Sequence, residues 1–113
     1  MTDPGEAIPP IDIRPEHWRI VQDILRHHVP QHEVWAFGSR ASRKAKPYSD
    51  LDLVIVAEEP LPHCLTGELS EAFSDSDLPW KVDVLDWAST DDSFRRIIEH
   101  SRVILQEKCP PNR

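Results

Sequence analysis

The segment from Asp50 to Val56 constrains the fold of this chain more than any other part of the sequence. Acidic and apolar residues alternate at its start, and its last four residues are all apolar. Side chains two positions apart on a strand point to the same face, so Asp50 and Asp52 share one face and the leucines beside them take the other. The pattern predicts a mostly buried strand that carries two carboxylates at its beginning.

Shorter patterns predict the elements around this strand. A proline and a glutamate at positions 15 and 16 suit a first helical turn, and apolar residues at three-to-four spacing follow until Pro30. Further strands are predicted at 33–37, 80–85 and 102–106, with a loop or one short helix at 39–47 and helices starting at Thr66 and after 89–92. The order predicts an α/β (α+β) fold, in which helices flank a small mixed sheet of about four strands.

The length of 113 residues suits one domain with one core. Residues 1–12 hold three prolines and no apolar period, which predicts a flexible or loosely docked tail. The domain is then predicted to cover residues 13–107, and residues 108–113 form a C-terminal tail.

The composition, with 39% hydrophobic and 29% charged residues, is typical of a soluble globular protein. Its longest uncharged apolar run, residues 53–57, is far shorter than the roughly 20 residues of a membrane span. No basic and then apolar signal segment opens the chain. The two cysteines, Cys64 and Cys109, are too few for a disulfide scaffold, so we expect a cytoplasmic protein without a membrane partner.

The charge limits the kinds of partner. Thirteen lysines and arginines against twenty aspartates and glutamates give a net charge of −7, so direct binding of nucleic acid is not expected. Any polyanion must meet a local basic patch or metal ions. One such patch lies just before the two carboxylates and consists of Arg40, Arg43, Lys44 and Lys46.

Two carboxylates on one face of a strand repel each other unless a cation lies between them, and Mg²⁺ suits such a pair. A solvated strand face is the simpler explanation for an isolated pair. Here, however, Gly38 and Ser39 follow the preceding strand, where backbone N–H groups and a hydroxyl can approach a phosphate closely. Together with the basic patch, these residues predict a site for a metal-bound nucleoside triphosphate.

A third carboxylate is expected from the strand at 80–85. Asp83 and Asp86 are three positions apart, so one of them at most can share a face with the first pair. Asp83 lies among valines in mid-strand, where an unpaired carboxylate is costly to bury, so we take it as the third member. Three such carboxylates suit two-metal phosphoryl transfer, with Asp50 and Asp52 bridging both ions and Asp83 orienting or deprotonating the nucleophile.

These residues carry a family resemblance. The run Phe37-Gly38-Ser39-Arg40-Ala41, with ten residues from Arg40 to Ser49 before Asp50-Leu51-Asp52-Leu53, resembles the signature of the polymerase β-like nucleotidyltransferase superfamily. Within that superfamily the chain is similar to the minimal nucleotidyltransferases, many of which are encoded beside a HEPN-domain toxin. The resemblance covers roughly residues 14–107 and includes 81–86. It departs at Ser42-Arg43, where many relatives have Arg-Gly.

The resemblance implies a polymerase β-like fold and an Mg²⁺-dependent nucleotidyltransferase that moves a nucleoside monophosphate, commonly AMP from ATP, with pyrophosphate leaving. The implied acceptor is a tyrosine hydroxyl of a cognate HEPN toxin, which makes the chain an antitoxin that works with its partner as a hetero-oligomer. Two Mg²⁺ ions are assigned to Asp50, Asp52 and Asp83. The residues assigned to the nucleotide and its phosphates are Gly38, Ser39, Arg40, Arg43 and Lys44.

Two alternatives stay open. An antitoxin could neutralise its toxin by contact alone, although a pure binder has no use for three converging carboxylates. The acceptor could also be a small molecule or an RNA end, although the net negative charge disfavours RNA. Trp80 and Trp87 are interpreted as core or rim residues rather than as platforms that stack on a base.

Overall fold

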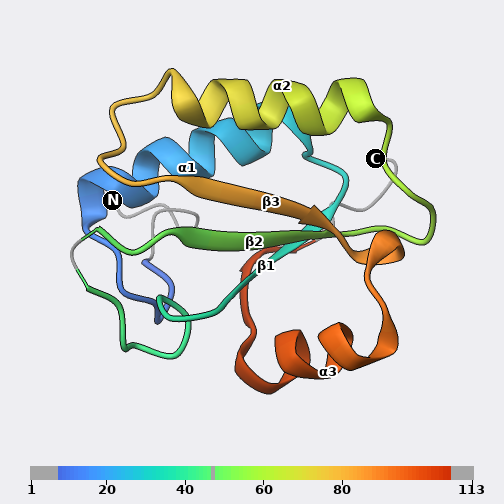
Figure 1. Cartoon of the computed structure of the whole chain (residues 1–113). Helices are drawn as coiled ribbons and strands as arrows, with labels where there is room; N and C mark the ends of the chain where they lie inside the picture. Colours follow the sequence, from blue (N-terminus) through green and yellow to red (C-terminus); the bar gives the residue numbers. More distant parts are fainter. Residues whose placement is uncertain (1–7, 47, 108–113) are drawn as a thin grey trace.

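The computed structural model describes residues 8–46 and 48–107, and within them four strands form one mixed sheet with helices on both faces (Figure 1). The elements in chain order are α1 (Pro15–His28), β1 (Glu33–Phe37), β2 (Leu51–Val56), α2 (His63–Ser74), β3 (Val82–Asp86), the 3₁₀ turn η2 (Trp87–Ser89), α3 (Asp92–Ser101) and β4 (Val103–Gln106). The strand order is β3-β2-β1-β4, with β2 and β3 parallel and the other pairs antiparallel. The predicted fold class is confirmed.

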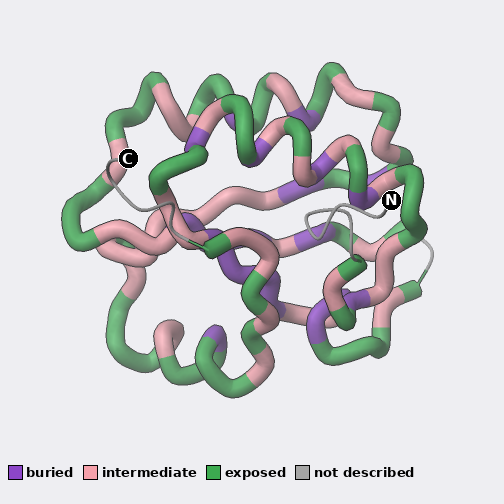
Figure 2. The backbone as a smooth tube through the Cα atoms, turned by 180° about the vertical axis from the view of Figure 1, so that it is seen from behind, coloured by how far each residue is buried: buried purple, intermediate pink, exposed green. Residues whose placement is uncertain are grey.

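The strand β2 packs as its alternation predicts. Leu51, Leu53 and Ile55 are fully buried on the face covered by α1 and α2, where they join apolar residues of both helices. Val54 points to the opposite face and packs with Ile98 of α3 in a second, smaller cluster. Figure 2 shows the buried positions concentrated in the strands and on the inward sides of the helices. The sheet therefore has a full core on one face and a thinner layer under α3.

Most predicted elements begin within two residues of their expected places, and α2 is the exception. The prediction that Thr66 caps this helix is wrong, because α2 begins at His63, directly after Pro62. The Thr66 hydroxyl donates to the His63 carbonyl inside the first turn. An earlier start places Leu65 on the helix, where it packs against the main core. Packing of this apolar residue thus outweighs the local capping preference.

The N-terminal segment differs from its prediction. Residues 1–7 lie outside the described part of the chain, as do residues 108–113 of the second predicted tail. The following residues are docked on the domain, since Ile11 is 4% exposed within the main core and Asp12 bonds to a loop after β1. Burial of Ile11 gives this proline-rich segment a fixed place that its composition did not indicate.

None of the helices in the described ranges is long and apolar enough to cross a membrane. The cytoplasmic location inferred from the composition stays a prediction.

Candidate active site

The parallel pair of strands, β2 and β3, brings two of the predicted carboxylates together. Asp52 of β2 lies directly opposite Asp83 of β3, and Phe37 of β1 lies opposite Asp52 on its other side. Residues in one such row point to one face of the sheet, and here it is the α3 face, because Phe37 packs edge-on against Phe94 of α3 at 5.7 Å. Asp50 is exposed and lies one residue before β2.

The electrostatics of this row centre on Asp52. Burial raises the pKa of the Asp52 carboxyl above its usual value, and the neighbouring charges of Asp83 and Asp50 raise it further. All three effects disfavour the ionised carboxylate. A cation bound between these groups would remove the repulsion and restore the charged form.

The fourth candidate carboxylate has a structural role. Asp86 at the end of β3 accepts hydrogen bonds from the backbone N–H groups of Leu61 and Ala88, at 2.8 and 3.1 Å, and from the Ser89 hydroxyl at 3.2 Å. It therefore caps the turn after β3, which leaves Asp83 as the carboxylate of this strand beside Asp52.

Both carboxylates open into a cleft of about 680 Å³ along β3. Phe37 and Phe94 line it on the α3 side, and Ser70 and Ser74 of α2 line its other side. A larger cavity of about 880 Å³ lies near Trp87 and the turn after β2, and it includes none of the predicted site residues. The smaller cleft is the candidate site, because it contains the predicted carboxylates and the larger cavity does not.

Lys81 is a cleft residue that the sequence analysis missed. Its ammonium Nζ lies 3.6 Å from Asp83 Oδ1, and both side chains are substantially exposed. The spacing held a signal, because residues 81 and 83 share one side of a strand. Lys81 gives the cleft a positive charge beside the third carboxylate.

The glycine after β1 lies against this site. Gly38 has φ of +81°, a conformation in which side chains are rarely tolerated, and a Cβ atom there would collide with the Asp52 carboxylate oxygen Oδ2. The backbone at Gly38 can therefore approach the carboxylate row because the side chain is absent. This agrees with the close backbone approach expected at a phosphate-binding turn.

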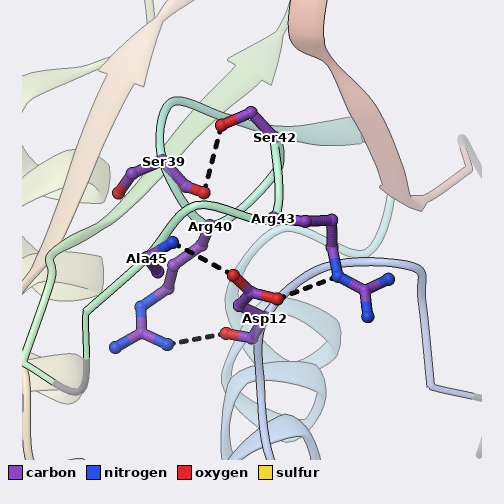
Figure 3. Close-up of polar contacts among 6 residues, drawn as sticks. All are labelled: Asp12, Ser39, Arg40, Ser42, Arg43 and Ala45. Carbon is purple, nitrogen blue, oxygen red and sulfur yellow. Dashed lines mark hydrogen bonds and ion pairs between the residues drawn. The ribbon is translucent and has the colours of Figure 1, made fainter.

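The loop that follows, residues 38–46, folds back on itself. The Gly38 carbonyl accepts from the Ser42 N–H at 3.0 Å, and the Ser39 carbonyl accepts from the Lys44 N–H at 2.9 Å. The Ser42 hydroxyl also donates to the Ser39 carbonyl at 3.2 Å (Figure 3). These bonds leave the Ser39 side chain half-buried beside Gly38 at the start of the loop.

Arg40 is buried within the domain and does not line the cleft that holds Asp52 and Asp83. Its side chain is 5% exposed, donates from Nε to the Ser49 carbonyl at 2.9 Å and from Nη1 to the Asp12 carbonyl at 2.6 Å, and lies 4.2 Å from the ring centre of Trp80. Burial lowers the pKa of the guanidinium, and the charges of Asp12 and Asp50 offset part of that effect. We correct the prediction: Arg40 is a structural residue of this loop.

Trp80 is likewise unsuited to stack on a base, because Arg40 covers its ring and His17 meets it edge-on at 5.7 Å. Its place in the core agrees with the interpretation of Trp80 as a packing residue.

The other two basic residues of the predicted site differ from each other. Arg43 has a φ of +65° and donates from Nε to the Asp12 carboxylate at 2.8 Å, so its charge is also directed toward Asp12. Lys44 is exposed and forms no ion pair with any residue of the described ranges. Lys44 is thus the better placed of the two to meet a phosphate.

The comparison with protein families agrees with this geometry. Residues 20–109 match the family described as "Polymerase beta, Nucleotidyltransferase". The chain belongs to this nucleotidyltransferase family.

Relatives of this nucleotidyltransferase include the probable protein adenylyltransferase MntA of Haemophilus influenzae, which is 56% identical over 98 residues, covering 87% of this chain and 86% of the relative. Two solved structures share the fold. A toxin–antitoxin crystallised with AMP-PNP has a TM-score of 0.68 at 22% identity over 80% of this chain and 73% of that one. The complex of tri-AMPylated Shewanella oneidensis HEPN toxin with MNT antitoxin has a TM-score of 0.62 at 20% identity, over 82% and 71%.

The carboxylates of this nucleotidyltransferase suit a metal ion that takes its remaining ligands from water and substrate. Within residues 8–46 and 48–107, no three His, Cys, Asp or Glu side chains are gathered closely enough to form a metal site by themselves. Asp52 and Asp83 nevertheless lie side by side, with Asp50 close enough to raise the pKa of Asp52. Mg²⁺ is commonly held by one or two carboxylates, with water and substrate phosphates as its other ligands.

Proposed function

We propose that this nucleotidyltransferase transfers AMP from ATP to a tyrosine hydroxyl of a cognate HEPN-domain toxin and so acts as its antitoxin. The observation that carries this proposal is the row formed by Asp52 and Asp83, with the Gly38 backbone directly against it. The 56% identity to a probable protein adenylyltransferase supports a protein as acceptor. The fold shared with complexes of HEPN toxin and MNT antitoxin supports the class of partner.

In the proposed reaction the acceptor oxygen attacks the α-phosphorus of ATP, a new P–O bond forms, and the bond to pyrophosphate breaks. Asp50 and Asp52 would hold the two Mg²⁺ ions, which would supply positive charge to the phosphates and lower the pKa of the acceptor hydroxyl. Asp83, at the edge of the sheet, would orient that hydroxyl and share in binding the first ion. The proton leaves the acceptor hydroxyl as the P–O bond forms, and Asp83 would accept it as general base.

The phosphates would lie against the loop at residues 38–46. Gly38 and Ser39 offer backbone N–H groups and a hydroxyl beside the carboxylates, and Lys44 offers an exposed charge from the same loop. Lys81 lies on the β3 side, next to the carboxylate proposed to meet the acceptor.

The test uses ATP labelled at its α-phosphate, Mg²⁺ and purified HEPN-domain proteins from the source genome as acceptors. Label should transfer to one of these, and mass spectrometry should find AMP on a tyrosine. Asp52→Asn and Asp83→Asn should each lower the rate by at least about a hundredfold. Asp23→Asn, an equal charge change at an exposed position of α1, is the matched control.

Transfer by Asp52→Asn at the wild-type rate would contradict the proposed site. A contact-only antitoxin makes a different prediction, since Asp52→Asn would then protect cells from the toxin as well as the wild type does. Labelling of a small molecule or an RNA end, with no labelled protein, would favour the remaining alternative.

A further inference from the structure

We propose that Asp12 is a positioning residue that holds the loop at residues 38–46 in its nucleotide-binding shape. The proposal rests on the proposed function of that loop in binding phosphates. Asp12 lies outside the sheet and outside the cleft, and neither the family match at residues 20–109 nor the sequence motifs include it. Its role follows from its contacts.

Asp12 bonds to both limbs of the loop (Figure 3). Its backbone N–H donates to the Arg40 carbonyl at 2.9 Å, and its own carbonyl accepts from Arg40 Nη1 at 2.6 Å. Its carboxylate accepts from Arg43 Nε through Oδ1 at 2.8 Å and from the Ala45 N–H through Oδ2 at 3.1 Å. Both carboxylate oxygens and both backbone groups of Asp12 are therefore used on one loop.

The far limb of the loop needs such support. Arg43 adopts a φ of +65°, which costs a non-glycine residue on the order of 1 kcal/mol. The Asp12 carboxylate bonds to the side chain of this residue and, two positions later, to the backbone N–H of Ala45, so it holds the loop at and just after the strained position.

Asp12 can act in this way because it is itself fixed. Ile11, the preceding residue, is 4% exposed in the main core, and α1 begins three residues after Asp12. Arg40 extends the connection, since its Nε donates to the carbonyl of Ser49, the residue before Asp50. Asp12 therefore connects the core to the loop at residues 38–46. Through Arg40, it also connects the core to the start of β2.

The variant Asp12→Asn tests the role with little change in size. An amide offers one acceptor oxygen where the carboxylate offers two, so it cannot serve Arg43 and Ala45 together. We expect the dissociation constant for Mg²⁺-AMP-PNP to rise about tenfold, as the loss of one charge-assisted hydrogen bond predicts. Isothermal titration of the full chain measures both this constant and the binding stoichiometry.

The binding stoichiometry distinguishes a role of Asp12 in positioning the loop from a role in keeping the protein folded. A positioning role raises the dissociation constant and leaves the stoichiometry at the wild-type value. Partial unfolding lowers the stoichiometry of the sample at a wild-type constant, and that result would overturn the proposal. Glu16→Gln is the matched control, since it removes an exposed ion pair with Arg14 that does not touch the loop, and it should bind as the wild type does.

Two substitutions at Arg43 provide an independent test. Arg43→Gly loses the ion pair but removes the strain, so it should bind Mg²⁺-AMP-PNP more tightly than Arg43→Ala does. Arg43→Ala loses the ion pair and keeps the strain, so it should bind as weakly as Asp12→Asn.

Wild-type affinity in Asp12→Asn, or equal affinities of Arg43→Gly and Arg43→Ala, would overturn the positioning role and leave the proposed function standing. A wild-type chain that binds no Mg²⁺-nucleotide would overturn both.

Discussion

Asp52 and Asp83 lie directly opposite each other in the parallel pairing of β2 and β3, although thirty-one positions separate them in the sequence. Two carboxylates placed side by side in a partly buried row destabilise the fold unless a cation or a proton is shared between them. The ionised Asp52 carboxylate therefore carries a cost in stability, which a cation bound at the row would remove.

Because of this cost, we expect the stability of the protein to depend on pH. The folded protein raises the pKa of Asp52 above its usual 3.8, so between these two values the folded state binds more protons than the unfolded chain does. The free energy of unfolding therefore falls as the pH rises from the unfolded-state pKa of Asp52 through its folded-state pKa. It stays lower at neutral pH. Without metal, Asp52→Asn should melt at a higher temperature than the wild type at pH 7, and the difference should shrink as the pH falls toward 3.

Scanning calorimetry in a chelating buffer measures this difference. Asp23→Asn on α1 provides the control, because it changes the net charge equally at a position away from the site. An Asp52→Asn variant that melts below the wild type at pH 7 would contradict the electrostatic cost assigned to the row.

Gly38 is expected to tolerate no side chain. In Gly38→Ala the new methyl group meets the Asp52 carboxylate, and the φ of +81° adds backbone strain. We expect a loss of about 1–3 kcal/mol in the free energy of unfolding and a loss of AMP transfer. Urea denaturation and the labelling assay check the two effects. Gly67→Ala on α2, where a Cβ would meet nothing within 4 Å, is the matched control and should be neutral or slightly stabilising.

Arg40 and Lys44 should separate stability from nucleotide binding. Arg40→Met leaves the carbonyls of Asp12 and Ser49 without their donor, so we expect a loss of about 3 kcal/mol in the free energy of unfolding. Lys44→Met should change that free energy by less than about 0.5 kcal/mol, because the side chain is exposed.

The affinity for Mg²⁺-AMP-PNP should not follow the free energy of unfolding in these two variants. Lys44→Met should weaken binding about fivefold through the loss of a phosphate contact. Two results would contradict these roles. One is an Arg40→Met variant that is as stable as the wild type but binds more weakly, and the other is a Lys44→Met variant that is destabilised.

Local sequence patterns were sufficient to predict where several residues of the candidate site lie in the fold. Alternation along residues 50–56 placed Asp50 and Asp52 on one face, and the position of Asp83 among valines distinguished it from Asp86. The glycine turn before them was visible from its spacing. These features depend on neighbours within a few positions, which strand geometry relates directly to faces and ends.

Other features depend on contacts between distant segments and left no local signal. Arg40 belongs to a basic cluster typical of phosphate sites, yet Trp80 and a backbone carbonyl of the N-terminal segment decide its role. Asp12 lies in a proline-rich segment that resembles a tail, and its partners are 28 to 33 positions away. Such contacts follow from the packing of Ile11 in the core, which composition alone cannot reveal.

The most direct test of the central claim locates the metal. Crystals of the wild type soaked with Mn²⁺ and AMP-PNP would show the ion by its anomalous scattering. We predict an ion bound by Asp52 with Asp50 or Asp83, and phosphates against Gly38 and Ser39. Nucleotide bound in the larger cavity near Trp87, with no ion at these carboxylates, would contradict the assignment of the active site.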